Sequence, residues 1–441
     1  MTTGRLNFLV SGRHQALSIL FILLAFAAAG WKVWMRAPAA DFAAAAKPAA
    51  VVASVSPAPV TAGNFRFDTQ FVSSSPGQAV HAASLVELQN GNLRAVWFSG
   101  SREGAGDVTI QSAVMDAASQ RWSTESTVFN RQQLQAGLWR YVKKLGNPVI
   151  ARAPDGSLSL WMVNVSLGGW AGSAITWARS TDEGLTWSKP KRLVTSPFLN
   201  ISTLVKGAPV AMADGQTSLP VYHEFVTKFG EVLRISAEGE VLDKTRVPQS
   251  QASLQPVLLA TDGSHATVYM RAGQGGKVKL SKTADAGKTW LPTRATGLPN
   301  PDSALAGVVD GRGIQWLALN PSAAGRASLG VLAANRAGSF EVTRPWFVEG
   351  ASGQQTAPSV ALYARLLGEE LKTAGADDAQ ISAYVASARR QLCGAENCAQ
   401  EFSYPYLLQT RDGYLHLVYT WHRTRIKHVR IDTLQAALAA N

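Results

Sequence analysis

Charged side chains gather in a glycine-rich loop that follows a hydrophobic stretch. The segment Trp97-Phe-Ser-Gly-Ser-Arg-Glu-Gly-Ala-Gly-Asp107 carries Arg102, Glu103 and Asp107. Loops after buried strands often hold binding and catalytic groups, and a carboxyl group there could act as a general acid or base. The alternative is a solvated turn. We treat the three residues as candidate site residues.

Other candidate ligand contacts stand in or beside strand-like segments. His81 lies in an apolar stretch, where a structural histidine is the alternative. Asn147 precedes Pro148, and Lys206 and His223 follow the apolar residues Val205 and Tyr222. The alternatives are a strand entry for Asn147 and surface charge for Lys206 and His223.

Two segments that could position such residues share the spacing Asp-x-Gly-x-Thr-Trp. They are Ser180–Trp187 and Lys282–Trp290, and Met115–Trp122 is a degenerate copy. The aspartate can accept backbone N–H bonds across a tight turn, and the glycine supplies a positive φ. The tryptophan is expected to pack within the sheet.

Six Asx-Gly pairs punctuate short strand-like stretches after residue 64. They are Asn90-Gly91, Asp155-Gly156, Asp214-Gly215, Asp262-Gly263, Asp310-Gly311 and Asp412-Gly413. Such pairs connect hairpins, and regular units of this kind with four strands each predict blades. The fold class is therefore all-β, a six-bladed β-propeller over residues 64–441. An array of β-sandwiches is the alternative.

One segment, residues 351–400, has helical periodicity instead. Helices are expected over Pro358–Leu371 and Asp377–Leu392, with Asp377 as an N-cap. This insertion is predicted to form a helical hairpin near the last blade. Cys393 and Cys398 are the only two cysteines, too few for a structural zinc site, and in an exported protein they favour a short-loop disulfide.

The N-terminus predicts export. Arg5 and Arg13 precede an apolar run over residues 16–30, followed by two tryptophans, which indicates a signal anchor or transmembrane segment over residues 1–36. A cleaved signal peptide is the alternative. The Ala- and Pro-rich residues 37–63 are expected to form an extended tether. The prediction is a membrane-anchored protein with its propeller on the periplasmic or extracellular side.

The composition indicates the chemical class of the binding partner. The 441 residues carry a formal charge of +12, which suits an anionic partner such as an acidic glycan. No zinc-finger spacing, RNA-binding motif or arginine-rich tract supports nucleic acid. No metal-binding loop is evident, and we expect no cofactor.

Several segments, in this order, resemble the sialidase (neuraminidase) superfamily, and in particular its bacterial branch with BNR repeats. They are the Asp-box turns, His81-Ala-Ala-Ser84, Trp97–Asp107, Leu298-Pro-Asn-Pro-Asp-Ser303, Glu401-Phe-Ser-Tyr-Pro405 and Tyr419–His428. The resemblance covers residues 66–432 apart from the insertion. Sialidases bind a carboxylate with three arginines, use an aspartate as acid/base, and use a tyrosine activated by a glutamate as nucleophile.

The resemblance implies roles for individual residues. Asp107 matches the acid/base, Tyr404 the nucleophile, and Arg271 one of the arginines. Gln255, before Pro256, resembles an inner-strand motif, and Asn300 stands in the region of the unassigned glutamate. The first arginine is replaced by His81, and no third one stands out.

Three functions stay open. The first is a sialidase-like exo-glycosidase that removes an acidic or deoxy sugar from a surface glycan, with Asp107 as acid/base and Tyr404 assisting hydrolysis. The second is a non-catalytic carbohydrate-binding or assembly propeller of the cell envelope. A polysaccharide lyase is the third.

Overall fold

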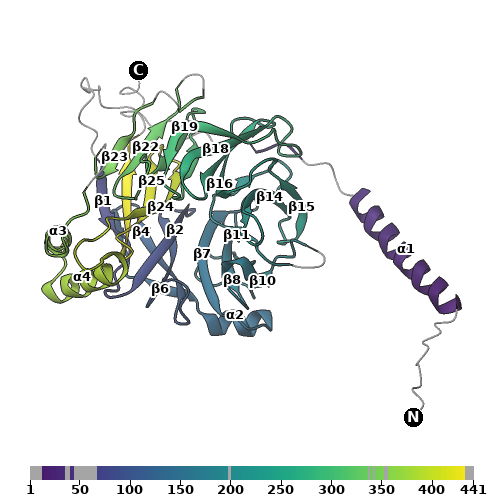
Figure 1. Cartoon of the computed structure of the whole chain (residues 1–441), viewed down its shortest axis with the longest axis horizontal. Helices are drawn as coiled ribbons and strands as arrows, with labels where there is room; N and C mark the ends of the chain where they lie inside the picture. The colour runs from purple at the N-terminus through teal and green to yellow at the C-terminus, as the bar shows by residue number, and fades with distance from the viewer. Residues whose placement is uncertain are drawn as a thin grey trace, which may run out of the picture. The chain divides into compact units, whose positions relative to one another are not determined.

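The computed structural model describes residues 12–34, 40–43, 67–196, 200–335, 338–340, 343–351 and 356–432. The chain divides into two compact units, Met1–Ala39 and Ala40–Asn441. Within the described part of the second unit, the strands form six antiparallel sheets, which are the six predicted blades (Figure 1).

The first three blades follow one another along the chain. Blade 1 contains β2 (Ala79–Glu87), β3 (Leu93–Gly100), β4 (Thr109–Asp116), β5 (Arg121–Trp122) and β6 (Ser126–Phe129). Blade 2 contains β7 (Lys144–Arg152), β8 (Leu158–Val165), β9 (Ser173–Ser180) and β10 (Lys191–Arg192). Blade 3 contains β11 (Leu204–Val205), β12 (Val210–Ala211), β13 (Thr217–His223), β14 (Phe229–Ile235) and β15 (Val241–Arg246).

The last three blades close the ring. Blade 4 contains β16 (Ser253–Ala260), β17 (Ala266–Ala272), β18 (Gly276–Thr283) and β19 (Arg294–Asn300). Blade 5 contains β20 (Ala306–Val309), β21 (Gln315–Leu319), β22 (Leu329–Ala333) and β23 (Trp346–Glu349). Blade 6 contains β24 (Phe402–Gln409), β25 (Leu415–Trp421), β26 (Arg425–Ile431) and the N-terminal strand β1 (Asp68–Phe71). Because β1 pairs with β26, the start of the propeller and its end share one sheet.

The Asp-box turns have the predicted mechanics. Asp182 accepts the backbone N–H of Thr186 at 2.9 Å, and Gly184 has a φ of +85°. Asp285 accepts the N–H of Thr289 at 2.9 Å in the same way. One predicted Asx-Gly pair lies in each blade, in the turn before β3, β8, β13, β17, β21 or β25, which explains why their number equals the number of blades.

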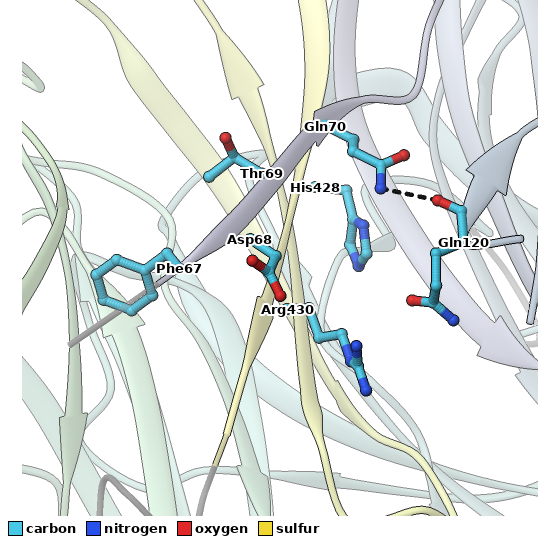
Figure 2. Close-up of a pocket in the computed structure, with 7 residues that line it drawn as sticks. All are labelled: Phe67, Asp68, Thr69, Gln70, Gln120, His428 and Arg430. Carbon is cyan, nitrogen blue, oxygen red and sulfur yellow. Dashed lines mark hydrogen bonds between the residues drawn. The ribbon is translucent and has the colours of Figure 1, made fainter.

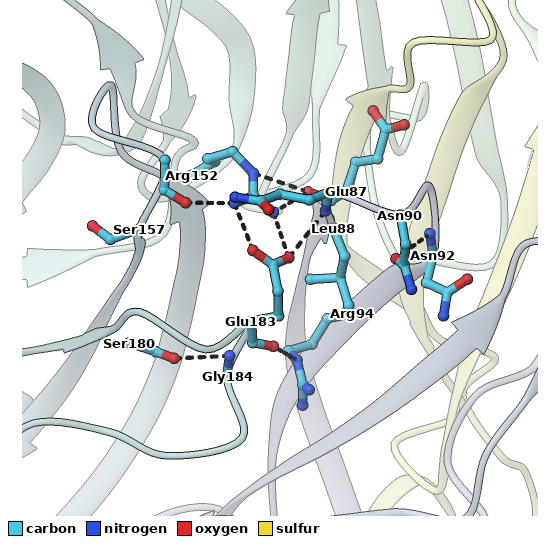
Figure 3. A network of polar contacts seen from close by, with 12 residues as sticks. Glu87, Leu88, Asn90, Asn92, Arg94, Arg152, Ser157, Ser180, Glu183 and Gly184 are labelled. Carbon is cyan, nitrogen blue, oxygen red and sulfur yellow. Dashed lines mark hydrogen bonds and ion pairs between the residues drawn. The ribbon is translucent and has the colours of Figure 1, made fainter.

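Charged side chains join neighbouring blades at the Asp-box turn of blade 2 (Figure 3). Glu183 binds both terminal nitrogens of Arg152, at 2.9 and 2.7 Å. Its backbone carbonyl accepts the Nε–H of Arg94, and Arg152 also donates to the carbonyl of Glu87 in blade 1. Glu87 in turn pairs with Arg411 of blade 6 at 2.9 Å. We call this end of the propeller the Asp-box end.

The core lies within and between the blades. The middle strands are rich in aliphatic and aromatic residues, and every residue of β3, β8 and β25 is buried. Trp97, Trp316 and Trp421 are at most 1% exposed. Trp290 is also buried, as expected for a tryptophan that packs within the sheets.

The insertion forms the predicted helical hairpin. The helix α3 (Val360–Thr373) begins after Ser359, and α4 (Asp378–Leu392) begins after Asp377, which forms a capping box with Gln380. Tyr363 and Tyr384 are buried in the same core cluster as the strands of blade 6. Cys393 and Cys398 form a disulfide directly after α4. A further short helix, α2 (Arg131–Leu138), joins blades 1 and 2, and a 3-10 turn, η1 (Trp170–Gly172), joins β8 and β9.

The N-terminal unit contains one helix, α1 (Gly12–Trp34). Among the described residues, no helix combines the length and apolarity that a membrane span requires, so the predicted transmembrane segment is not confirmed.

Part of the predicted tether lies on the propeller. Phe42 is 2% exposed, forms a bridge with Met212, and joins the core cluster that contains Trp290. Its N–H donates to the carbonyl of Gly263 at 2.7 Å. Residues 40–43 therefore differ from the extended segment that their composition suggested, because Phe42 is the only aromatic residue there and can be buried. The other tether residues lie outside the described ranges.

Candidate functional site

One residue other than glycine adopts a left-handed conformation at, or shortly before, the first strand of every blade. The six residues, with φ between +41° and +58°, are Ala82, Asn147, Ser202, Gln255, Asp302 and Tyr404. In β2, β7, β16 and β24 the strand pairing shifts at the same place, which marks a β-bulge. Left-handed residues of this kind cost of order 1–3 kcal/mol and concentrate at functional sites, as do bulges.

These bulges lie at the end of the propeller opposite the Asp-box end. Asn147 is near the start of β7, whereas Arg152, which binds Glu183, ends that strand. We call the end that carries the six left-handed residues the bulge end. Loop 101–108 belongs to it, because Gly100 pairs with Ala79 at the start of β2.

Tyr404 contacts residues from two other blades. Its hydroxyl accepts a hydrogen bond from Nε2 of Gln255 at 2.9 Å, and its ring lies 4.1 Å from the ring of His81. Nearby, Asn147 donates to the hydroxyl of Tyr222 at 3.3 Å. The bulges thus bring side chains from blades 1, 2, 3, 4 and 6 to the centre of the propeller.

The orientation of the Gln255 amide follows from Arg271. A guanidinium can only donate, and Nη1 of Arg271 lies 3.0 Å from Oε1 of Gln255. The NH₂ group of Gln255 must therefore face Tyr404. An amide cannot take up the phenolic proton at neutral pH. Among the described residues no carboxylate bonds to the Tyr404 hydroxyl, so the tyrosine–glutamate pair that the resemblance implies is not formed here.

Arg271 is itself paired. Its Nε lies 2.6 Å from Oδ1 of Asp302, and its side chain is only 13% exposed. Burial works to raise the pKa of Asp302, but the hydrogen bond and charge of Arg271 outweigh it and hold that pKa below its usual range. At neutral pH the pair is therefore an ionised arginine and an ionised aspartate.

A second ion group lies beside the first. Glu401 binds Nη1 of Arg326 at 3.2 Å and Nε of Arg423 at 3.0 Å. Burial would raise the pKa of Glu401, whereas the two arginines, together with a hydrogen bond from Ser403, hold it below the usual value. Arg326 also donates to the carbonyl of Asp302 at 2.9 Å, which joins the two ion groups.

His81 is buried beside both ion groups, with 4% of its surface exposed. Burial, followed by the charges of Arg423, Arg326 and two further cations, lowers the pKa of His81 well below its usual value. The ring is therefore neutral at pH 7. Its Nδ1 is buried and has no hydrogen-bond partner among the described residues, an uncommon state for a buried polar atom.

Lys206 makes a link between blades next to Tyr404. Its ammonium group donates to the carbonyl of Pro405, which joins blade 3 to blade 6 across the centre. Burial lowers the pKa of Lys206 to about 7. Tyr406 makes a second such link, from blade 6 to the carbonyl of Ile150 in blade 2, at 3.4 Å.

The loop with Asp107 reaches this centre only through Glu103. Glu103 pairs with Nη1 of Arg423 at 3.3 Å. Asp107 is exposed, and both of its oxygens accept hydrogen bonds from Ser101, from the backbone N–H and from the hydroxyl, each at 3.0 Å. Arg102 is also exposed. The structure thus places Asp107 at the bulge end but does not bring it into contact with Tyr404.

Two other predicted residues support the site from a distance. Asn300 is fully buried, and its amide bonds to the backbone of Ala272 and Ser303, which fixes the turn that carries Asp302. His223 stacks on Phe229, with ring centres 4.6 Å apart.

Sequence reasoning missed Tyr222, Arg326 and Glu401, and read Arg423 as part of a solvated basic face. It noted Glu224 beside His223 and Asp302 beside Asn300 but gave neither a role. Glu224 is half-buried, and burial, with added repulsion from Asp302 and Glu103, raises its pKa despite Lys228 and Arg271. The sequence does mark three of the bulges, because Asn147, Gln255 and Tyr404 each stand directly before a proline. No such signal marks the residues that were missed.

Two hollows lie away from this centre. The larger, of about 370 Å³, lies between blades 1 and 6 and is lined by residues such as Gln70, Gln120, His428 and Arg430 (Figure 2). The other, of about 230 Å³, is lined by residues of blades 4 and 5, including Lys282 and Phe340. Across the described ranges, no group of three or more His, Cys, Asp or Glu residues could hold a metal ion.

Solved structures similar to this chain include sialidases and a protein of unknown function. A Hadza microbial sialidase, Hz136, matches with a TM-score of 0.55 and 15% identity over 80% of this chain and 66% of its own. A leech intramolecular trans-sialidase complexed with 2,7-anhydro-Neu5Ac matches with a TM-score of 0.57 and 12% identity, over 86% of this chain and 71% of its own. A protein of unknown function from Dyadobacter fermentans matches with a TM-score of 0.57 and 11% identity, over 82% and 97%.

This chain spans just under two thirds of the Hadza sialidase, and at these identities the likeness concerns the fold. No curated protein sequence matches the chain. The family model of the BNR repeat-like domain matches residues 91–417, which is most of the propeller. The chain therefore belongs to the BNR repeat-like domain family.

Proposed function

We propose that this protein binds a sugar unit of a surface glycan at the bulge end, and that it does so without the nucleophile of a sialidase. The observation that carries the proposal is the contact between Tyr404 and Gln255, in which an amide stands where the chemistry of a tyrosine nucleophile needs a base.

The groups at the bulge end suit a polyhydroxylated ligand. Sugar hydroxyls both donate and accept, and Tyr222, Tyr404, Gln255 and the unpartnered Nδ1 of His81 offer both functions within one buried setting. Lys206 donates to the carbonyl of Pro405, the residue after Tyr404, and this bond helps to hold Tyr404 in place. The sialidase-like fold supports a ligand of this class.

Hydrolysis is a second candidate. Asp107 as acid/base and Tyr404 as assisting hydroxyl remain the roles that the family resemblance implies. Glu224 adds a specific observation, because burial raises the pKa of this half-buried carboxyl group, so it holds its proton to higher pH than an exposed glutamate does.

Purified protein screened against isolated polysaccharides and 4-methylumbelliferyl glycosides separates the candidates. We expect binding without turnover, and loss of binding in Tyr404→Phe. Tyr406→Phe is the matched control, because it removes a hydroxyl from the same strand that points to another blade. Turnover that Tyr404→Phe or Asp107→Asn abolishes would establish hydrolysis instead, an unsaturated uronate product would indicate a lyase, and no binding at all would refute the proposal.

We also propose that residues 1–36 hold the protein at the cell envelope, with the propeller outside the cytoplasm. The support is the basic and apolar pattern of the sequence. Recovery of the full chain in the membrane fraction, and of a protein starting at residue 37 in the soluble fraction, is the expected result. Equal distribution of the two would contradict it.

A further inference from the structure

The arginines at the bulge end are already neutralised by carboxylates of the chain itself. Asp302 occupies Arg271. Glu401 lies between Arg326 and Arg423, and Glu103 takes a further nitrogen of Arg423. Glu224 interacts electrostatically with Lys228, Arg271 and Asp302, so four carboxyl groups accompany three arginines, Lys228 and the buried Lys206. The carboxyl groups therefore balance most of the positive charge at the bulge end, although the whole chain is basic.

A ligand carboxylate would have to compete with these partners for the arginines. An arginine binds a carboxylate best with two parallel N–H···O bonds, and N–H groups on both Nε and Nη1 of Arg271 already serve Asp302 and Gln255. Asp302 and Glu401 are both ionised at neutral pH, so an incoming carboxylate would also meet like charge. A hydroxyl group meets neither difficulty, because it can donate to Asp302 or accept from Arg271.

We propose that the bulge end selects a neutral sugar over the corresponding carboxylate-bearing sugar, and that Asp302 is the residue that sets this preference. This inference rests on the proposed glycan binding at the same site. It replaces the expectation of an anionic partner, which followed from the charge of the whole chain.

The test compares matched ligands that differ only in the carboxyl group. Calorimetric titration measures the affinity for two pairs of oligosaccharides, one pair ending in galactose or galacturonate and the other in glucose or glucuronate. A third pair consists of the best ligand of the glycan screen and its carboxyl-reduced or oxidised form. The wild-type protein should bind the neutral member at least about tenfold more tightly. Asp302→Asn should narrow or invert the ratio of the affinities for the neutral and the carboxylate-bearing sugar, because it leaves Arg271 without its anion. Asparagine tolerates the left-handed conformation of residue 302, so the variant should fold.

Asp155→Asn is the matched control. Asp155 also pairs with one arginine, Arg179, and its side chain is 36% exposed, like that of Asp302, but it lies in the turn that follows Arg152 at the Asp-box end. This variant should leave the ratio unchanged. Glu103→Gln, which removes the exposed partner of Arg423, should narrow the ratio and serves if Asp302→Asn lowers the melting temperature.

Preference of the wild-type protein for the carboxylate member would overturn this inference alone, and so would an unchanged ratio in both Asp302→Asn and Glu103→Gln. Failure to bind either member of every pair would overturn the proposed function together with this inference.

Discussion

Two glutamates at opposite ends of the propeller show how differently the ends use charge. Glu183 at the Asp-box end is 31% exposed and meets Arg152, which is 26% exposed, so both remain partly in water. Glu401 at the bulge end is 11% exposed and lies between two arginines that are 20% and 25% exposed. Beside it, His81 is buried with one ring nitrogen unpartnered. The charged groups at the Asp-box end serve to join neighbouring blades. The bulge end holds more deeply buried charges and, in Nδ1 of His81, a polar atom without a hydrogen-bond partner among the described residues.

Acid should affect blade 6 and the strand that carries His81 more strongly than the Asp-box turn of blade 2. Burial lowers the pKa of His416 and His422 to about 3, and those of His81 and His428 well below the usual value. In the unfolded chain these rings titrate near 6.5, so below that pH the unfolded state binds more protons and the free energy of unfolding falls. From pH 7 to 5.5 we expect a loss of about 4 kcal/mol.

The Asp-box turn of blade 2 should be insensitive to pH over this range. Hydrogen bonds from Thr186 lower the pKa of Asp182 to about 2, so this turn keeps its charge over the same pH range. Hydrogen exchange at pH 5.5 should therefore show blade 6 and the start of β2 opening before the turn around Asp182. A free energy of unfolding that is flat between pH 7 and 5.5 would show that the buried histidines are accommodated as cations.

Glu401→Gln should have the largest effect among single substitutions. It leaves Arg326 and Arg423 partly buried without their shared anion, which typically costs about 3 kcal/mol. Urea unfolding measures the loss, and ligand titration should show weakened binding because both guanidinium groups lose their position. A change in stability below about 1 kcal/mol would mean that water or another carboxylate replaces Glu401.

Glu183→Gln should have a smaller effect, confined to stability. It weakens the pair with Arg152 across the first two blades and should lower the free energy of unfolding by about 1 kcal/mol, since both partners are partly exposed. Glycan affinity should not change. Loss of affinity with unchanged stability would place the functional site at the wrong end of the propeller.

Lys206→Met should have the smallest effect on stability and a clear one on binding. Methionine has a similar length and removes the cost of burying an amine, so we expect stability within about 1 kcal/mol of the wild type. The carbonyl of Pro405 loses its donor, so Tyr404 next to it should be held less precisely and affinity should fall. Large destabilisation with unchanged affinity would make Lys206 a purely structural residue.

The sequence predicted the architecture well and the site in part. The Asx-Gly pairs and the Asp boxes are local signals that depend on backbone conformation, so they identified six blades correctly. His81, Gln255, Arg271 and Tyr404 could be singled out because each lies near the start of an inner strand or at the end of its neighbour. Their convergence follows from the closure of the ring.

The remaining site residues depend on pairing that a sequence does not display. Arg326, Glu401 and Arg423 come from loops and strand ends of blades 5 and 6, and only the folded chain shows that the two arginines share one glutamate. Asp107 illustrates the reverse case. Its loop was placed at the correct end, but the direction of its side chain is set by two hydrogen bonds from Ser101.

Two arginines test the contrast between the ends most directly. Arg271 at the bulge end and Arg152 at the Asp-box end each bind one carboxylate and are both largely buried, with side chains 13% and 26% exposed. The measurement is the affinity and melting temperature of Arg271→Ala and Arg152→Ala with the best glycan of the screen. We predict that Arg271→Ala loses at least about tenfold in affinity, whereas Arg152→Ala melts earlier and binds as the wild type does. Unchanged affinity in a folded Arg271→Ala, or lost affinity in Arg152→Ala, would contradict the assignment of the bulge end as the glycan site.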